Sequence, residues 1–155
     1  MLTAKARSPA CDPLMKPTVL ALGSNSTNAR EIFSGALAML ARAGWSTRRL
    51  SSIITTAPVE CQPGTPDFQN AVCVGSWPGS AEELLDLTQS VERAFGRPAN
   101  HRSDQARPLD IDIILFGEER ITSARLTVPH PRARKRKFVT EPLREIAPEL
   151  INLLL

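Results

Sequence analysis

The sequence predicts an α+β domain with a ferredoxin-like βαββαβ core, in which helices pack on an antiparallel sheet. Three observations lead to this fold class. Strand-like apolar runs and helix-like apolar stripes follow one another in the order β-α-β-β-α-β. A length of 155 residues fits one domain with a core of ordinary size. Hydrophobic residues at 42% and charged residues at 23% are close to globular averages, so disorder or a coiled-coil rod fits poorly.

The first strand is expected at residues 18–22, where the apolar run TVLAL stops at Gly23. The preceding residues 1–17 contain two internal prolines, scattered charge and no apolar periodicity, a pattern that predicts a flexible tail. We therefore expect the folded domain to comprise residues 18–155.

Two helices are expected on the basis of their starts and their apolar spacing. Asn28 stands three residues before Glu31, as in a capping arrangement, and apolar residues then recur at helical spacing up to a glycine. Ser80 and Glu83 form a capping box for the second helix, whose apolar stripe ends at Gly96.

Three further strands complete the predicted core. Residues 52–56 are rich in β-branched side chains, residues 69–77 alternate, and residues 109–116 alternate and then become fully apolar. The sequence VECQPGTPDF between the first two predicts a long irregular loop, and such loops are often functional. The later segment EPLREIAPEL, residues 141–150, is amphipathic.

Composition narrows the classes of function. A net charge of +3 favours anionic partners but does not choose between nucleotide and nucleic acid. The three cysteines form no CxxC pair, so neither a disulfide framework nor a zinc site is indicated. Aromatic residues at 5%, with no tyrosine, disfavour a stacking platform for single-stranded nucleic acid. Without a bilayer-length apolar run or a secretory leader, we expect a cytoplasmic protein with no membrane partner.

A pair of carboxylates is the first candidate for chemistry. Asp110 and Asp112 are two residues apart on a predicted strand, so their side chains share one face while Ile111 points to the other. Neighbouring carboxylates repel, a cost that a bound Mg²⁺ removes, and Mg²⁺ is usually held by one or two carboxylates and substrate phosphates. The alternative is an edge strand that presents a polar face to water.

Cationic residues surround the carboxylate pair in the sequence. The loop before it carries Arg97, Arg102 and Arg107, which could close onto phosphate oxygens, and the alternative is a solvated loop. His130, between two prolines, could donate to a phosphate, although a structural histidine is the commoner case. Residues 132–137 hold five cations in six positions, which is typical of a solvated face or a nucleic-acid patch.

An amide and an aromatic ring lie close together in the sequence at the start of the third predicted strand. Asn70 could present a paired donor and acceptor to the edge of a heterocycle, and Phe68 could stack on its ring. A turn residue and a core phenylalanine are the alternative interpretation.

Taken together, these segments resemble the 6-hydroxymethyl-7,8-dihydropterin pyrophosphokinases of folate biosynthesis. The resemblance runs from about Thr18 to Leu150, and the ordered combination of PDFxNAV, LDIDIILFG and LTVPHP makes it specific. The matching stretches are ALGSN at 21–25, APV at 57–59, PDFQNAV at 66–72, EELLDLTQSVERAFGR at 82–97, RPLDIDIILFG at 107–117 and RLTVPHPRARKRKFVTEPLREIAPEL at 125–150.

The resemblance implies a reaction. In the family, the pterin hydroxymethyl oxygen attacks the β-phosphorus of ATP, the diphosphoryl group moves to the pterin, and AMP leaves. ATP is thus the co-substrate, and two Mg²⁺ ions bridge the reactants with Asp110 and Asp112 as their ligands. The same carboxylates are the metal-binding pair of the preceding argument. We expect a monomer whose partners are these small molecules, with no nucleic-acid partner.

The resemblance also implies roles for individual residues. The residues implied to contact the pterin are Ala57, Pro58, Val59, Phe68, Asn70 and Phe138, with the two phenylalanines stacking on its faces. Those implied to contact ATP are Gln89, Glu92, Arg107, Ile113, Arg125, Thr127, His130 and Arg136. The catalytic set comprises Arg97, Arg107, Asp110 and Asp112. Most of the remaining cations of residues 132–137 are then expected to be solvated charge.

The loop before the aspartates departs from the family pattern. Family members usually carry a tryptophan where this chain has Asp104, and basic residues where it has Ala99 and Asn100. Two other functions therefore stay open. One is a divergent paralogue that binds nucleotide or pterin without turnover, and the other is a nucleic-acid module that uses the cations of residues 132–137.

Overall fold

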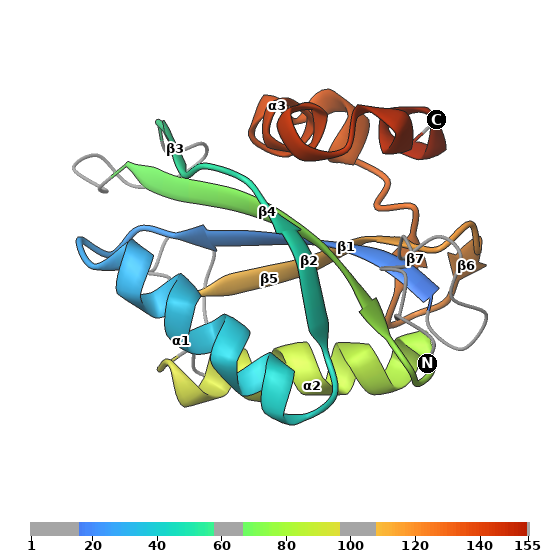
Figure 1. Cartoon of the computed structure of the whole chain (residues 1–155), viewed down its shortest axis with the longest axis horizontal. Helices are drawn as coiled ribbons and strands as arrows, with labels where there is room; N and C mark the ends of the chain where they lie inside the picture. The colour runs from blue at the N-terminus through green and yellow to red at the C-terminus, as the bar shows by residue number, and fades with distance from the viewer. Residues whose placement is uncertain (1–15, 58–66, 97–107, 155) are drawn as a thin grey trace, which may run out of the picture.

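The structure, a computed structural model, describes residues 16–57, 67–96 and 108–154 and confirms the predicted α+β architecture (Figure 1). The core elements are β1 (Lys16–Ser24), α1 (Ala29–Arg42), β2 (Ser46–Leu50), β3 (Ile54–Thr56), β4 (Phe68–Trp77), α2 (Ala81–Ala94) and β5 (Asp110–Phe116). The C-terminal elements are β6 (Ile121–Thr122), β7 (Thr127–Val128), a 3-10 turn (Ala133–Lys135), α3 (Lys137–Ile146) and a 3-10 segment (Pro148–Leu154).

The main sheet has ferredoxin-like topology. Its strand order is β2-β4-β1-β5 with antiparallel pairing throughout, and β3 pairs with the first residues of β4. Helices α1 and α2 lie on one face, below the sheet in Figure 1, whereas α3 lies above the opposite face. The central strand β1 therefore has β4 on one side and β5 on the other.

The second predicted strand differs from the observed one. The prediction placed it at residues 52–56, of which β3 forms only Ile54–Thr56, and the preceding strand β2 was not predicted. Its sequence STRRL lacks apolar alternation because β2 is an edge strand with four of its five residues exposed. At the other end of the predicted domain, β1 begins at Lys16, so residues 16 and 17 of the predicted tail are strand, and residues 1–15 lie outside the described ranges.

Of the two capping arrangements predicted at the helix N-termini, one is observed and the other is not. The capping box of α2 is confirmed, because the Glu83 backbone N–H donates to Ser80 Oγ at 3.1 Å and the Ser80 N–H donates to Glu83 Oε1 at 3.0 Å. Asn28 is the N-cap of α1, but its side chain makes no capping hydrogen bond, contrary to the predicted arrangement. Its backbone angles, φ −106° and ψ 37°, lie outside the extended region in which an N-cap side chain reaches the next turn.

Apolar side chains form a core on each face of the sheet. Leu20 and Leu22 of β1 point into the core that α1 and α2 cover. Val19 and Ala21 point into a second core, which Val139 and Leu143 of α3 complete. The amphipathic segment predicted near the C-terminus thus closes the second face, and fully burying a side chain such as Leu143 contributes about 1.5–3 kcal/mol.

A β-bulge in β5 changes the direction of its side chains. Val19 pairs with Leu115 and Leu20 pairs with Ile113, so Ile114 is the extra residue. Ile114 and Leu115 both join the core beneath α3, which explains why the predicted alternation gives way to a continuous apolar run. The alternation that precedes the bulge is kept, so Asp110 and Asp112 share one face.

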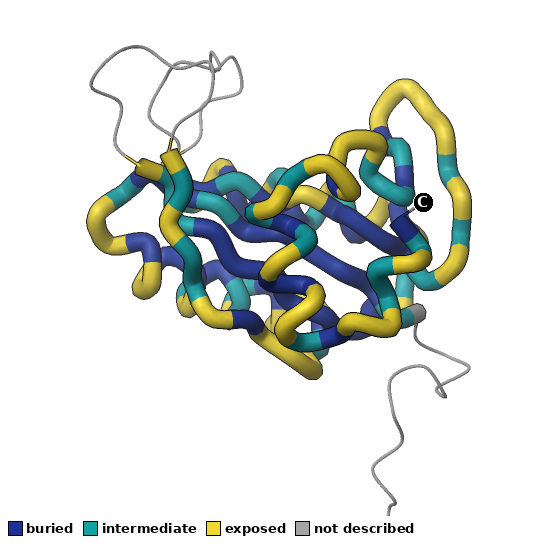
Figure 2. Tube along the Cα trace, turned by 90° about the horizontal axis from the view of Figure 1, so that it is seen from above, coloured by how far each residue is buried: buried dark blue, intermediate teal, exposed yellow. Residues whose placement is uncertain are grey.

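Burial follows this layered arrangement. Figure 2 shows the buried residues concentrated in the strands at the middle of the molecule, with exposed residues along the outer turns of the helices and the loops. Among the described helices, none is long and apolar enough to cross a bilayer.

Candidate active site

Strand register places predicted site residues of β4 and β5 on either side of β1. Gly23 of β1 pairs with Asp110 of β5 on one side and with Asn70 of β4 on the other. Two residues before Gly23 in β1, Ala21 pairs with Asp112. Because directly opposed residues point to the same face, and Ala21 faces the core beneath α3, all of these positions face α3.

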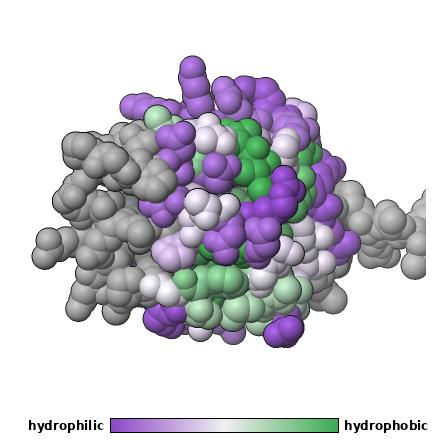
Figure 3. All heavy atoms as spheres, turned by 90° about the vertical axis from the view of Figure 1, so that its left-hand side faces the viewer, coloured by the Kyte–Doolittle hydropathy of each residue, from purple (hydrophilic) through white to green (hydrophobic). Residues whose placement is uncertain are grey.

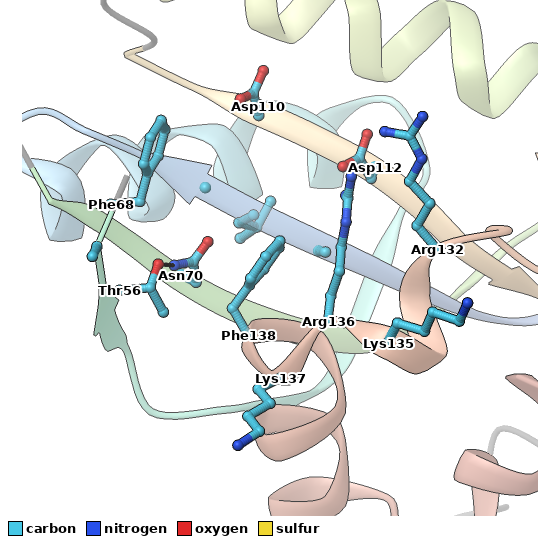
Figure 4. Close-up of a pocket in the computed structure, with 14 residues that line it drawn as sticks. Thr56, Phe68, Asn70, Asp110, Asp112, Arg132, Lys135, Arg136, Lys137 and Phe138 are labelled. Carbon is cyan, nitrogen blue, oxygen red and sulfur yellow. Dashed lines mark hydrogen bonds between the residues drawn. The ribbon is translucent and has the colours of Figure 1, made fainter. Parts of the chain in front are cut away.

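These residues line an open pocket with a volume of about 610 Å³, within the usual range for ligand sites (Figure 4). Its floor is the small-residue surface of β1, and its walls come from β3, β4, β5 and the start of α3. The lining residues are Ala21, Leu22, Gly23, Thr56, Ala57, Phe68, Asn70, Asp110, Asp112, Arg132, Lys135, Arg136, Lys137 and Phe138.

One end of the pocket combines an amide with two aromatic rings. The Asn70 side chain is 6% exposed, and its Nδ2 donates to Thr56 Oγ1 at 2.8 Å. This bond directs Oδ1 over the floor, where a methyl group on Gly23 would lie 3.4 Å from it. The rings of Phe68 and Phe138 lie at the same end of the pocket, from β4 and α3 respectively (Figure 4).

The other end of the pocket holds the carboxylate pair. Asp110 is half-buried and Asp112 is exposed, while Ile111 and Ile113 are buried in the core beneath α1 and α2. Within the described ranges, no three His, Cys, Asp or Glu side chains gather closely enough to hold a metal ion. Two carboxylates fit a Mg²⁺ ion that keeps water and substrate phosphates as its other ligands.

A cationic wall faces the carboxylates, and it contains more of the charged run than the sequence predicted. Arg132 and Arg136 reach toward Asp112, whereas Lys135 and Lys137 are among the lining residues but direct their ammonium groups away from the carboxylates (Figure 4). The neighbours of Arg136 in this run, Arg132, Arg134, Lys135 and Lys137, are all exposed, as expected of solvated charge. The 3-10 turn and the first turn of α3 wrap residues 132–137 around the pocket, a change of direction that charge spacing alone does not reveal.

His130 lies beside this wall with one tautomer favoured. Its backbone N–H donates to Ile114 O at 2.9 Å, and its Nδ1 accepts from the Arg132 N–H at 3.2 Å. Burial lowers the pKa of His130; Asp112 raises it, and Arg136 and Arg132 lower it further. A neutral ring with Nδ1 as acceptor leaves Nε2–H as a donor, which suits an anionic ligand.

Several residues implied to contact ATP lie outside the pocket lining. Arg125 donates to Glu82 at 2.9 Å, to Asp86 at 2.6 Å and to Gln89 at 3.4 Å on the exposed side of α2. Others are the buried Glu92 and Ile113, and Thr127 in β7. Pro58, Val59, Arg97 and Arg107 fall outside the described residues, as do the loop positions Ala99, Asn100, Arg102 and Asp104.

Sequence reasoning missed some lining residues. Thr56 immediately precedes the APV segment and ends a β-branched run, a position from which contact with the site could have been inferred. Gly23 was interpreted only as the end of a strand. Its role at the pocket floor depends on pairing with both β4 and β5. This pairing cannot be predicted from the residues next to Gly23 in the sequence.

The side of the molecule at which β3 and the start of β4 lie is mainly hydrophilic on its described surface. Figure 3 shows polar side chains around a smaller hydrophobic area there. Fold and pocket together define a ferredoxin-like protein with an open pocket lined by aromatic, amide, carboxylate and cationic side chains.

The comparisons with known proteins identify the family. Residues 19–148 match the family model of 7,8-dihydro-6-hydroxymethylpterin-pyrophosphokinase (HPPK), and the chain belongs to this family. The 2-amino-4-hydroxy-6-hydroxymethyldihydropteridine pyrophosphokinase of Haemophilus influenzae is 37% identical over 133 residues, covering 85% of this chain and 82% of that protein. The Bacillus subtilis protein of the same name is 36% identical over 132 residues, covering 84% and 78%.

Other relatives are much longer than this chain. The mitochondrial folate synthesis bifunctional protein of Arabidopsis thaliana is 40% identical over 125 residues, which are 81% of this chain but 22% of that protein. A second Arabidopsis bifunctional protein is matched over 26% of its length. A Plasmodium falciparum HPPK-DHPS crystal structure superposes with a TM-score of 0.65 at 14% identity, covering 87% of this chain and 40% of that one, and supports the fold.

Proposed function

We propose that this chain transfers the diphosphate of ATP to the hydroxymethyl group of 6-hydroxymethyl-7,8-dihydropterin and releases AMP. The hydroxymethyl oxygen would form a bond to the β-phosphorus as the bond from that phosphorus to the AMP oxygen breaks, and the hydroxyl proton would be lost. The observation that supports the proposal most directly is that one pocket combines an amide, Asn70, at one end with the paired carboxylates Asp110 and Asp112 and nearby cations at the other.

The amide end of the pocket is proposed to bind the pterin. Asn70 Oδ1 would accept a hydrogen bond from the N–H edge of the ring, because the bond from Nδ2 to Thr56 directs Oδ1 toward the pocket floor. Phe68 and Phe138 would stack on the two ring faces. Ala57 lines the same end, and Pro58 and Val59 are proposed to complete it.

The charged end is proposed to bind the polyphosphate. Asp110 and Asp112 would hold two Mg²⁺ ions, whose chemistry is to neutralise phosphate charge as the β-phosphorus is attacked. Arg136 and His130 would donate to phosphate oxygens across the pocket from the carboxylates. Further ATP contacts are proposed for Gln89, Arg107, Ile113, Arg125 and Thr127, and catalytic closure is proposed for Arg97 and Arg107.

The proposal also covers the oligomeric state and the cellular location of the protein. We propose a monomer as the functional unit. We propose the cytoplasm as its location, in line with the cysteine pattern.

The test is release of AMP from ATP in the presence of Mg²⁺ and the reduced pterin alcohol. We expect turnover by the wild-type chain, and a loss on the order of a hundredfold or more in Asp110→Asn and in Asp112→Asn, with an unchanged thermal midpoint. Each variant keeps the shape of the side chain and removes the charge that a hard cation requires. Wild-type turnover in both variants would remove the carboxylate pair from the proposal.

The altered loop motivates one rival function, a protein that binds without turnover. Asp104 stands where the family usually has tryptophan, so a negative charge replaces an apolar aromatic side chain in the sequence of this loop. A Mg²⁺-dependent complex with ATP that never yields AMP would favour this rival. Binding of nucleic acid that falls steeply with salt and ignores Mg²⁺ would favour the nucleic-acid module instead.

A further inference from the structure

Glu92 is a buried carboxylate that contacts the strand carrying the aspartate pair. It lies near the end of α2 and is 8% exposed, although glutamates are rarely buried unless they have a partner. Its Oε2 accepts from the Ile111 backbone N–H at 2.8 Å. Ile111 is the residue between Asp110 and Asp112, so the hydrogen bond reaches the strand midway between the two proposed ligands.

The position of β5 in the sheet explains why this contact matters. β5 is the last strand in the sheet order and pairs with β1 on one side. A backbone amide at a strand edge lacks the neighbouring strand that would otherwise accept its hydrogen bond. The Glu92 carboxylate supplies that acceptor, and a bond to an ionised acceptor is shorter and stronger than a neutral one.

The geometry also separates Glu92 from the pocket itself. The Ile111 side chain packs in the core beneath α1 and α2, whereas the two aspartates point to the opposite face. Glu92 approaches from α2 and is absent from the pocket lining. The hydrogen bond between Glu92 and Ile111 therefore connects α2 to the two aspartates through the backbone of β5.

We propose that Glu92 is a positioning residue that fixes the Ile111 amide and so sets the spacing and direction of Asp110 and Asp112. This inference rests on the proposed function, in which the two aspartates hold divalent cations. A partner that orients metal ligands from outside the coordination sphere commonly changes metal affinity by 10- to 100-fold when it is removed. The role predicted here differs from a direct contact between Glu92 and ATP.

Three variants separate positioning from general stability. Glu92→Ala removes the acceptor, and Glu92→Gln keeps an oxygen that can accept from Ile111 without carrying charge. Thr88→Ala is the matched control, because Thr88 lies one turn earlier on the same buried face of α2 and donates from Oγ1 to Leu85 O at 2.9 Å. It removes a side-chain hydrogen bond within α2 and leaves the bond from the Ile111 amide to Glu92 in place.

The first readout is Mn²⁺ affinity, measured by electron paramagnetic resonance with a non-hydrolysable ATP analogue. We expect roughly 10- to 100-fold weaker Mn²⁺ binding in Glu92→Ala, an affinity within about threefold of wild type in Glu92→Gln, and wild-type affinity in Thr88→Ala. Binding of the analogue without metal should be the same in all four proteins. A direct ATP contact would instead weaken metal-free binding in Glu92→Ala.

The second readout is hydrogen exchange of the Ile111 amide, followed by NMR. Protection should persist in wild type, Glu92→Gln and Thr88→Ala, and fall in Glu92→Ala.

Wild-type Mn²⁺ affinity in Glu92→Ala, or equal loss of Mn²⁺ affinity in Glu92→Gln and Glu92→Ala, overturns the positioning role. If Glu92→Ala does not fold, Glu92→Gln still decides, because loss of either Ile111 protection or metal affinity in it contradicts the proposal. Neither readout needs turnover, so a wild-type protein that binds Mn²⁺ but releases no AMP refutes the proposed reaction alone.

Discussion

At the scale of single residues, Gly23 makes room for a ligand on the pocket floor. A methyl group there would lie 3.4 Å from Asn70 Oδ1 and 3.9 Å from Asp110 Cβ, in ordinary contact with both. We expect Gly23→Ala to fold and to weaken pterin binding about tenfold, equivalent to about 1.4 kcal/mol, because the methyl group occupies space between amide and carboxylate. Calorimetric titration with the pterin alcohol measures this loss. Unchanged affinity would show that the ligand does not approach the floor of β1.

The amide of Asn70 gives a second prediction at this scale. Asn70→Ala should cost pterin binding about 1–3 kcal/mol and leave Mg²⁺-dependent ATP binding within a few-fold of wild type, because the lost hydrogen bonds serve one ligand. Thr56→Val should cost less, since it removes the bond at 2.8 Å that orients the amide but keeps the amide itself. Paired titrations with each ligand test this order, and equal losses for both ligands in Asn70→Ala would make the residue structural.

The residues of the site were predictable to different extents. Asp110 and Asp112 could be placed on one face from their spacing alone, since that alternation depends only on strand geometry. Lys135 and Lys137 could not be assigned to the pocket lining, because their position depends on a 3-10 turn that folds the charged run back over the sheet. The position of these side chains depends on pairing between distant strands and on a reversal of the chain. Neither feature can be recognised from the residue pattern of a short segment.

At the scale of elements, predictability followed burial and capping. The helix α2 has both a capping box and a continuous apolar stripe, so its start and its buried face were predicted correctly. The strand β2 is exposed along most of its length, and its charged sequence gave no signal. Tertiary pairing with β4 makes it a strand despite that sequence.

A hydrogen-bonded clamp between two elements yields the next prediction. The Glu145 carboxylate of α3 accepts from the Ser52 N–H at 3.0 Å and from Ser52 Oγ at 2.6 Å, beside β3. Since α3 carries Phe138 and β3 carries Thr56, the clamp joins opposite walls of the pocket. Glu145→Ala should weaken pterin binding about three- to tenfold while costing about 1 kcal/mol or less in unfolding free energy, because the clamp is exposed.

Two variants control for this clamp. Glu145→Gln keeps an acceptor for Ser52 and should restore most of the affinity. Glu141→Ala alters an exposed carboxylate one turn earlier on α3 and should leave binding unchanged. Titration with the pterin alcohol and urea denaturation give the two quantities. A Glu145→Ala protein that loses stability but no affinity would limit the clamp to a role in folding.

At the scale of the whole molecule, the sheet is shared by two cores and one pocket. Cys73 of β4 lies fully buried in the core beneath α1 and α2, and burial raises the pKa of its thiol to about 12 despite an opposing backbone hydrogen bond with Leu20. At pH 8 the thiol is therefore protonated in the folded protein, and the thiolate that reacts with alkylating agents is scarce. Alkylation of Cys73 should require opening of the sheet.

The alkylation rate of this buried thiol reports how often the fold opens, so it can measure how much a bound ligand stabilises the protein. The pocket walls come from β1, β3, β4, β5 and α3, so a ligand that requires the complete pocket binds only the folded chain and stabilises it by mass action. At a concentration one hundred times its Kd, ATP with Mg²⁺ should add about 2.7 kcal/mol and slow Cys73 alkylation about a hundredfold. The measurement uses a chain with Cys11→Ser and Cys61→Ser, which leaves one thiol. Chelation of Mg²⁺, or Asp112→Asn, should remove the protection. If ATP protects Cys73 equally without divalent metal, the nucleotide binds without the carboxylate pair, and the cationic wall alone holds its phosphates.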